Sequence, residues 1–303
     1  MIDFKSFQLQ DRPLYDRYLT HCGERGCEYS FVNLYLWGRQ QAAIREDRML
    51  FFSQFNRRSV YLFPIGPGDR KASIDAIIED ARQRGIPCRL TGLLQEDCTL
   101  LEQLYPGQFR YHFDRDSFDY IYSIHDLADL KGRKFQKKRN HLNRFRQAHP
   151  AWQLEPITAG NLDQVRHFVR HWYEVRLADN PHGDYQMEQA AIEKLLRHWQ
   201  ELDMEGLLLT NDGETLAFTM GSPLAEDTFD IHFEKALDIA DGAYAAINQG
   251  FAAYLREKYP QLLWLNREDD MGLEGLRKAK LSYCPDHMIE KHWACLLEDC
   301  YDY

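Results

Sequence analysis

A run of polar residues late in the chain could bind a substrate and move a proton. Residues 262–265, Leu-Leu-Trp-Leu, have the length and flanks of a buried strand. We expect the strand to present the polar side chains after it at its carboxyl end: Asn266, Arg267, Glu268, Asp269 and Asp270. Glu268 and Asp269 are candidate catalytic carboxylates. The other three are candidates for substrate binding.

A short helix over residues 273–281 is predicted to follow, and Pro285 prevents its continuation. Arg277 and Lys280 lie three residues apart, so both could meet one anionic group of a donor substrate. Tyr283 could act as a general acid. The alternatives are that the cations complement the helix dipole and pair with the nearby carboxylates, and that Tyr283 is a buried aromatic residue.

Glu234 ends a predicted central strand that faces the same region. A carboxylate in that place could act as a general base or bind an amine. It could equally be a surface charge at the end of the strand. We keep Glu234 as a catalytic candidate.

Metal binding is not predicted. His167 and His171 are four residues apart, with Glu174 near them, but apolar neighbours show that this helix mainly faces the core. Cys22 and Cys27 lack the second cysteine pair of a zinc ribbon. We therefore expect neither a metal nor a permanently bound cofactor.

One segment is strongly basic in an otherwise acidic chain of net charge −10. Between residues 131 and 146 it has eight basic residues and no acidic one. Such a helix could bind the phosphates of a polyanion, for example the acceptor arm of a tRNA. We choose Lys134, Lys138 and Arg139 as its contacts. The alternative is a solvated helix packed by an apolar stripe of Phe135, Leu142 and Phe145.

The first half of the chain predicts helices, a strand meander and then α/β alternation. Helices are expected at 11–24, 70–84 and 95–105, and strands at 49–55, 59–64, 87–94 and within 111–124. Residues 30–37 could form a strand or a short helix. Residues 125–130 are predicted to be a linker.

The second half predicts a longer version of the same order. Helices are expected at 132–148, 161–177, 187–202, 243–258 and 273–281, and strands at 152–157, 206–210, 215–221, 228–234, 262–265 and near the C-terminus. Asn180-Pro181-His182-Gly183 is expected to be a loop. Asn211-Asp212-Gly213 is a strong hairpin signal. We predict an α+β fold of two units, each a mixed, mostly antiparallel sheet flanked by helices, over residues 1–128 and 129–303, with the basic helix at 131–148 opening the second.

Composition excludes several classes. The 303 residues suffice for two domains with substantial cores. We find no signal peptide and no apolar run long enough to cross a bilayer. Seven scattered cysteines indicate reduced thiols, so we expect a cytoplasmic protein. No serine-hydrolase elbow or Walker loop is present.

Three strings together resemble the soluble relatives of the phosphatidylglycerol lysyltransferase C-terminal domain. They are residues 266–280, 241–248 and 30–37, and the first is the most specific. The resemblance runs through essentially the whole chain and implies two tandem GNAT-like acyltransferase units, akin to the peptidyl transferases that use aminoacyl-tRNA. It also draws Tyr244 and Asn248, within the second string, into the predicted substrate site.

The resemblance implies transfer of an aminoacyl group from aminoacyl-tRNA to an amine or hydroxyl acceptor, either a small molecule or a lipid headgroup. An acetyl-CoA-dependent N-acetyltransferase is the alternative enzyme. However, where such enzymes hold pyrophosphate on a glycine-rich turn, this chain has Asp238 and Asp241 beside the single Gly242. A non-catalytic GNAT-like protein that binds an anionic ligand is the alternative outside enzymes.

Overall fold

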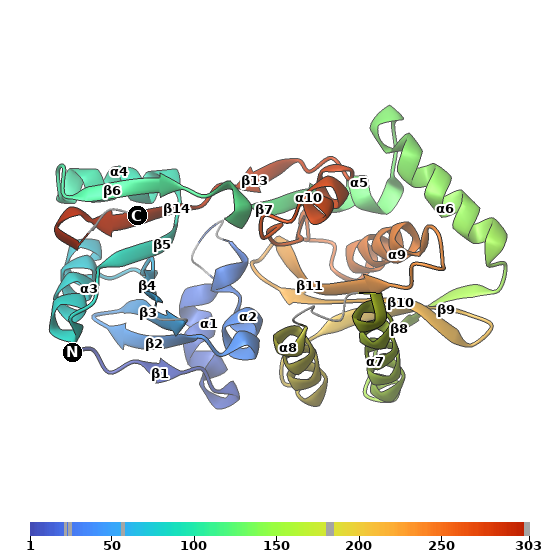
Figure 1. The fold of residues 1–303 in the computed structure, drawn as a ribbon, viewed down its shortest axis with the longest axis horizontal. Coiled ribbons are helices and arrows are strands. Elements are labelled where there is room, and N and C mark those ends of the chain that lie inside the picture. Colours follow the sequence, from blue (N-terminus) through green and yellow to red (C-terminus); the bar gives the residue numbers. More distant parts are fainter. Residues whose placement is uncertain (21–22, 24–25, 56–57, 180–184, 300–303) are drawn as a thin grey trace. The chain divides into compact units, whose positions relative to one another are not determined.

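The chain folds into two compact units, each built around a seven-stranded mixed sheet (Figure 1). In the computed structural model, residues 1–20, 23, 26–55, 58–179 and 185–299 are described. The predicted loop at residues 180–183 lies outside them. The first unit comprises Met1–Asp119, Asp269–Glu274 and Met288–Tyr303, and the second comprises Tyr120–Glu268 and Gly275–His287.

The first unit has the sheet order β1-β2-β3-β4-β5-β14-β6. Its strands are β1 (Lys5–Ser6), β2 (Gln40–Arg45), β3 (Arg48–Phe55), β4 (Arg58–Leu62), β5 (Arg89–Leu93), β6 (Phe109–Phe113) and β14 (His292–Leu296). Its helices are α1 (Arg12–Leu19), α2 (Phe31–Trp37), α3 (Arg70–Arg84) and α4 (Gln95–Leu104). Residues 30–37 therefore form a helix, which Ser30 caps by accepting from the Asn33 amide. The sequence analysis did not predict β2, since its first strand was expected at residues 49–55.

Helix α3 matches its predicted bounds, residues 70–84, whereas α1 is shorter than the predicted 11–24. The Asp69 side chain accepts a hydrogen bond from the Ala72 amide at the start, and Gly85 ends the helix at φ 66°. Between these caps, Ile74 and Ile77 are fully buried against β-strand residues such as Leu90. Burial of each isoleucine side chain contributes about 1.5–3 kcal/mol.

The second unit has the sheet order β13-β7-β12-β11-β10-β9-β8. Its strands are β7 (Asp119–Ser123), β8 (Trp152–Pro156), β9 (Glu205–Asn211), β10 (Glu214–Pro223), β11 (Thr228–Ala236), β12 (Trp264–Asn266) and β13 (His287–Ile289). Its helices are α5 (Ile124–Asp129), α6 (Gln136–Ala148), α7 (Leu162–Asp179), α8 (Gln186–Arg197), α9 (Ala243–Lys258) and α10 (Glu274–Leu281). Strand β12 runs parallel to β11 and antiparallel to β7.

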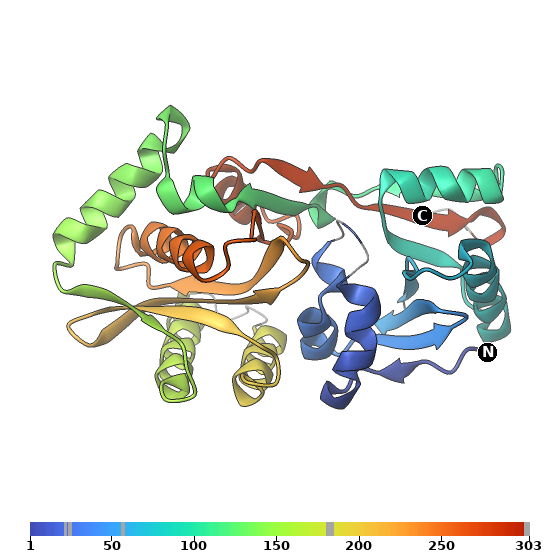
Figure 2. The same cartoon turned by 180° about the vertical axis from the view of Figure 1, so that it is seen from behind.

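Helices cover both faces of this second sheet. Helices α7 and α8 lie on one face and α9 lies on the other, as both views show (Figure 2). Helix α9 packs against α5 and α6 as well as against β9, β10 and β11. Segment 125–130, predicted to be a linker, instead belongs mostly to α5, because Ile124 and Leu127 are buried in the core.

The basic helix is confirmed as α6, preceded by one turn of 3₁₀ helix at Arg133–Phe135. Its predicted apolar stripe is buried. None of the described helices combines the length and the apolar character needed to cross a bilayer.

The two units are discontinuous in sequence. After β13, the chain returns to the first unit, where β14 pairs antiparallel with β5 and β6. The predicted ranges 1–128 and 129–303 made each domain one continuous stretch and did not include this return.

Candidate active site

One polar cluster of the second unit is centred on Glu234, near the end of β11. Its Oε1 forms an ion pair with Nη2 of Arg267 at 2.8 Å, just after β12. Its Oε2 accepts a hydrogen bond from Asn248 of α9 at 3.4 Å. Glu234 and Arg267 are both largely buried. Three predicted site residues that are far apart in sequence are therefore in contact.

Tyr283 also contacts Arg267. The Arg267 guanidinium is 4.9 Å from the centre of the Tyr283 ring, and Lys138 Nζ is 3.6 Å from the same ring. Burial raises the pKa of Tyr283, so its hydroxyl stays protonated at neutral pH. Burial, aided by the charge of Arg267, lowers the pKa of Lys138 to about 8. The pair thus offers a proton donor and a lysine that can lose its proton.

Several buried polar atoms of this cluster have no hydrogen-bond partner within the described part of the chain. They are Arg267 Nη1, a donor, Asn248 Oδ1, an acceptor, and the hydroxyl of Thr219, which lies opposite Glu234 on β10. Buried polar groups are nearly always paired, so each exception needs an explanation, such as a catalytic role or a bound water or ion. Tyr244, in the first turn of α9, is partly exposed, and burial of its hydroxyl raises its pKa.

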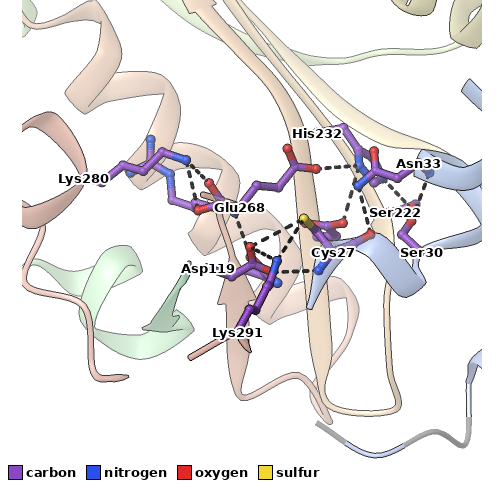
Figure 3. Close-up of polar contacts among 12 residues, drawn as sticks. Cys27, Ser30, Asn33, Asp119, Ser222, His232, Glu268, Lys280 and Lys291 are labelled. Carbon is purple, nitrogen blue, oxygen red and sulfur yellow. Dashed lines mark hydrogen bonds and ion pairs between the residues drawn. The ribbon is translucent and has the colours of Figure 1, made fainter. Parts of the chain in front are cut away.

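The residues after β12 form a loop whose backbone amide and carbonyl groups are bound by the side chains of Asn266 and Lys280. The Asn266 side chain accepts from the Glu268 amide at 2.7 Å, and Glu268 adopts φ 56°. Lys280 is buried, and its ammonium donates to the carbonyl oxygens of Arg267 and Glu268 (Figure 3). In this structure the charge of Lys280 holds the loop, and its contact with an anionic substrate stays a prediction. Arg277, partly exposed on α10, stays a prediction.

Asp269 and Asp270 belong to the first unit. Asp270 is fully buried, with one oxygen 3.5 Å from Arg115 and the other accepting from the Gly272 amide. Asp269 accepts from the Met271 amide at 3.1 Å. These contacts form a turn within that unit. The catalytic role of Asp269 and the binding role of Asp270 stay predictions.

The three predicted polyanion contacts on α6 and in the turn before it have different partners within the protein. Lys134 pairs with Asp126 at 2.7 Å, and Arg139 donates to the carbonyls of Leu130 and Gly132. Lys138 faces Tyr283. The outer face of α6 instead has a hollow of about 550 Å³, lined by Lys137, Asn140, His141, Asn143, Arg144 and Gln147. Lys137 and Arg144 are the basic residues that line this hollow, and the roles of Lys134, Lys138 and Arg139 in binding a polyanion stay predictions.

The turn before α9 is covered by α6. Gly242 has φ 88°, and a β-carbon there would lie 2.4 Å from the His141 carbonyl oxygen. Asp241 is within 3.4 Å of Arg144, and Asp238 pairs with Arg176 at 2.9 Å. The amides at the start of α9 are thus beside another helix and two paired carboxylates.

A second polar group of this unit escaped the sequence analysis. The imidazole of His232 on β11 lies between Ser222 of β10, at 2.8 Å, and two carboxylates, Asp230 at 3.5 Å and Glu268 at 3.4 Å (Figure 3). A signal for it exists in the sequence, because Asp230, His232 and Glu234 alternate with the apolar residues Phe229, Ile231 and Phe233 along the strand.

A third group lies in the first unit around Lys291. Its buried ammonium is 2.7 Å from Asp119 and 2.5 Å from Glu28, with the Cys27 sulfur at 3.8 Å. The two carboxylates and the thiol are spaced so that they could hold a metal ion. The lysine ammonium already provides positive charge there, so this group is best understood as a buried ion-pair network.

Comparison with known proteins places the fold. A family model described as phosphatidylglycerol lysyltransferase, C-terminal, matches residues 20–295. A conserved protein of unknown function from Bacteroides thetaiotaomicron is 38% identical, with a TM-score of 0.92 over 98% of this chain and 100% of that one. The chain spans about half the length (55%) of the curated relative that it matches, an uncharacterised protein of Mycoplasmoides gallisepticum.

Two further structures share the fold at low identity. L-PGS from Bacillus licheniformis is 16% identical, with a TM-score of 0.70 over 98% of this chain and 94% of that one. FemX is 10% identical, with a TM-score of 0.60 over 98% of each chain. The matched family and the tandem GNAT and FemX-like folds together point to a GNAT-like acyltransferase.

Proposed function

Since the chain belongs to the phosphatidylglycerol lysyltransferase C-terminal family, we propose that it transfers an aminoacyl group from aminoacyl-tRNA to an amine or hydroxyl acceptor. The observation that supports this most is the cluster around Glu234. It combines a buried carboxylate, a buried guanidinium with an unused N–H, a lysine of lowered pKa and a protonated tyrosine.

These groups match the parts of an aminoacyl ester. Glu234 and the unpaired Asn248 oxygen would bind the ammonium of the amino acid. Arg267 Nη1 would bind the carbonyl oxygen, on which negative charge develops during attack. Neutral Lys138 would take the proton of the acceptor, whose nitrogen or oxygen forms the new bond to the carbonyl carbon. Tyr283 would protonate the ribose oxygen as its bond breaks.

The contacts at α9 support aminoacyl-tRNA over acyl-CoA. A pyrophosphate on the first amides of α9 would have to fit beside α6 and near two carboxylates. The outer face of α6, with Lys137 and Arg144, offers instead a surface for the phosphates of an RNA backbone.

Single-turnover transfer tests the proposal. Labelled lysyl-tRNA and alanyl-tRNA would be mixed with excess enzyme and an acceptor, either phosphatidylglycerol vesicles or a small amine. We expect loss of the ester well above spontaneous hydrolysis, and a decrease of about 10²–10³-fold in Arg267→Lys, which keeps the charge but changes the hydrogen-bonding geometry.

Arg256→Lys is the matched control, because Arg256 of α9 pairs with Asp129 away from the cluster. Equal effects of the two substitutions would contradict the assigned role of Arg267. Absence of transfer from any donor, with retained tRNA binding, would favour a non-catalytic binding protein.

A further inference from the structure

The group around His232 has the geometry of a metal site. Asp230 and His232 lie on β11, and Glu268 lies two residues beyond the end of β12. Their nearest ligand atoms, Asp230 Oδ2, His232 Nδ1 and Glu268 Oε1, are all within 4.8 Å of one another. Because β11 and β12 are neighbouring parallel strands, the sheet itself positions all three residues.

The local strand geometry orients the histidine. In the β10–β11 ladder, Met220 pairs with Phe233 and Gly221 pairs with Ile231, so His232 is an extra residue on β11. Such a bulge changes the direction of a side chain, and bulges are over-represented beside active sites. Glu268 is held in the left-handed region at φ 56°, and Lys280 and the Tyr120 amide bind its carbonyl oxygen.

Distances distinguish ligands of one ion from partners in a salt bridge. His232 Nδ1 is 3.5 Å from Asp230 and 3.4 Å from Glu268. A charge-assisted hydrogen bond between an imidazolium and a carboxylate is usually ~2.7–2.9 Å long. Two ligand atoms at ~2.1 Å from a tetrahedral zinc ion are ~3.4 Å apart. The observed spacing therefore fits a shared ion better than a direct ion pair.

Ser222 provides the second layer that a metal-bound histidine needs. Its hydroxyl is 2.8 Å from His232 Nε2 and is fully buried. A metal on Nδ1 leaves the proton on Nε2, and this N–H can donate a hydrogen bond to the Ser222 hydroxyl oxygen, which fixes the ring orientation. The same burial argues against Ser222 as a catalytic nucleophile, because no substrate carbonyl can reach its oxygen.

We propose that Asp230, His232 and Glu268 bind a first-row divalent transition-metal ion, with Zn²⁺ as the reference. One imidazole and two carboxylates form a mixed N/O donor set that such ions accept. Three protein ligands leave a coordination position open. The Glu268 side chain is 25% exposed whereas those of Asp230 and His232 are fully buried, so the ion would enter from the Glu268 side.

Metal content after chelation and reloading tests this proposal. The full chain would be stripped with a chelator, loaded with Zn²⁺, passed through gel filtration and measured by mass spectrometry. We expect about one ion per chain in the wild type. In His232→Ala and Glu268→Gln we expect that ion to be lost, and in Ser222→Ala we expect a decrease in affinity of about 10–100-fold.

His198→Ala is the matched control, since His198 is 3.5 Å from one carboxylate, Glu201, and should not affect the bound ion. Loading with Co²⁺ separates this site from the cysteines, because N/O ligands give d–d bands without a thiolate charge-transfer band.

Glu268→Gln, at the most exposed ligand, keeps the test valid if His232→Ala does not fold. The proposal is overturned if the wild type retains no ion, if both ligand variants retain as much as the wild type, or if a thiolate band appears.

Discussion

Lys138 shows how one side chain's surroundings change its chemistry. A lysine can act as a general base only when its amine is deprotonated. Burial beside Arg267 lowers the pKa of Lys138 to about 8. We therefore expect kcat/KM for transfer to rise with pH and to level off above about pH 8. Lys138→Arg, which stays protonated, should remove most activity. Lys137→Arg, at the next and exposed position, is the control, and an unchanged pH profile in Lys138→Arg would exclude Lys138 as the base.

The same pKa makes a prediction about stability. The folded pKa of Lys138 is about 8, below the value of about 10.4 for an unfolded lysine. The cost of holding the cation is therefore fully present below pH 8. This cost decreases as the pH rises from about 8 to about 10.4, because in that range the folded state has lost the proton while the unfolded state still binds it.

Lys138→Met should accordingly raise the free energy of unfolding at pH 7 by about 1 kcal/mol, after allowing for solvent screening of this partly exposed group. The gain should shrink toward pH 10. Urea unfolding at both pH values measures it, with Lys137→Met as the control. A gain that does not change with pH would contradict the lowered pKa.

Some of these residues could be predicted from the sequence and others could not. Glu234 was predicted as a polar residue at a strand end, Asn248 as part of a family string, and Tyr283 from its place just after the predicted helix at 273–281. The inward direction of Lys138 was missed although Phe135, Lys138 and Leu142 share one helix face. The role of Lys280 depends on which carbonyls its ammonium reaches, and spacing along a helix does not indicate that.

Among the elements, the basic helix α6 has two different faces. Its inner face contributes Lys138 to the polar cluster, and its outer face has Lys137 and Arg144. If the outer face binds the phosphates of tRNA, Lys137→Glu with Arg144→Glu should weaken binding. The slope of log affinity against log salt should fall by about 0.7–0.9 for each lost contact.

Arg170→Glu with Arg197→Glu is the matched control, because it makes the same charge change on the exposed surfaces of α7 and α8. Filter binding of aminoacyl-tRNA over a salt series measures both double variants. A similar loss in the two would mean that net charge, and not α6, governs binding.

The junction of α6 and α9 gives a second prediction at this scale. Gly242→Ala forces a positive φ on alanine and places its β-carbon 2.4 Å from the His141 carbonyl oxygen. Gly213→Ala, at φ 83° in open space, has the backbone strain without the contact. We expect Gly242→Ala to cost about 1–3 kcal/mol more than Gly213→Ala in thermal unfolding. Equal costs would mean that α6 moves away easily.

Elements with clear end signals, such as α9 and α10, were predicted well, whereas α5 was not. The bounds of α9 agree with the prediction because Gly242 precedes the helix and Pro260 follows it. Helix α5 was taken for a linker because a six-residue helix has too few turns for a clear apolar period. The triplet at β11 was missed because its alternating polar residues resemble those of any half-buried strand, and its bulge depends on pairing with β10.

For the whole molecule, the main departure from the sequence prediction is the return of the chain to the first unit. Leu296 of β14 is buried in that unit's sheet, whereas Leu297 is 42% exposed. Leu296→Ala should cost about 2–4 kcal/mol and reduce amide protection in β5 and β6. Leu297→Ala should change little. Hydrogen exchange would contradict the assignment if β8 to β10 lost protection in place of β5 and β6.

The discontinuous units explain why the run at residues 266–285 was only partly understood from sequence. Asn266, Arg267 and Glu268 belong to the second unit and Asp269 and Asp270 to the first. Adjacent residues of the run therefore belong to different units, and Arg267 and Tyr283 are the two for which contacts in the cluster around Glu234 are described above.

A donor competition in a single reaction tests the central claim most directly. Excess enzyme would meet labelled aminoacyl-tRNA and differently labelled acetyl-CoA together with the acceptors, and transfer of each label would be followed over one turnover. We predict that the aminoacyl label moves to an acceptor, that the acetyl label does not, and that Arg267→Lys reduces this transfer. Transfer of the acetyl label alone would contradict the account.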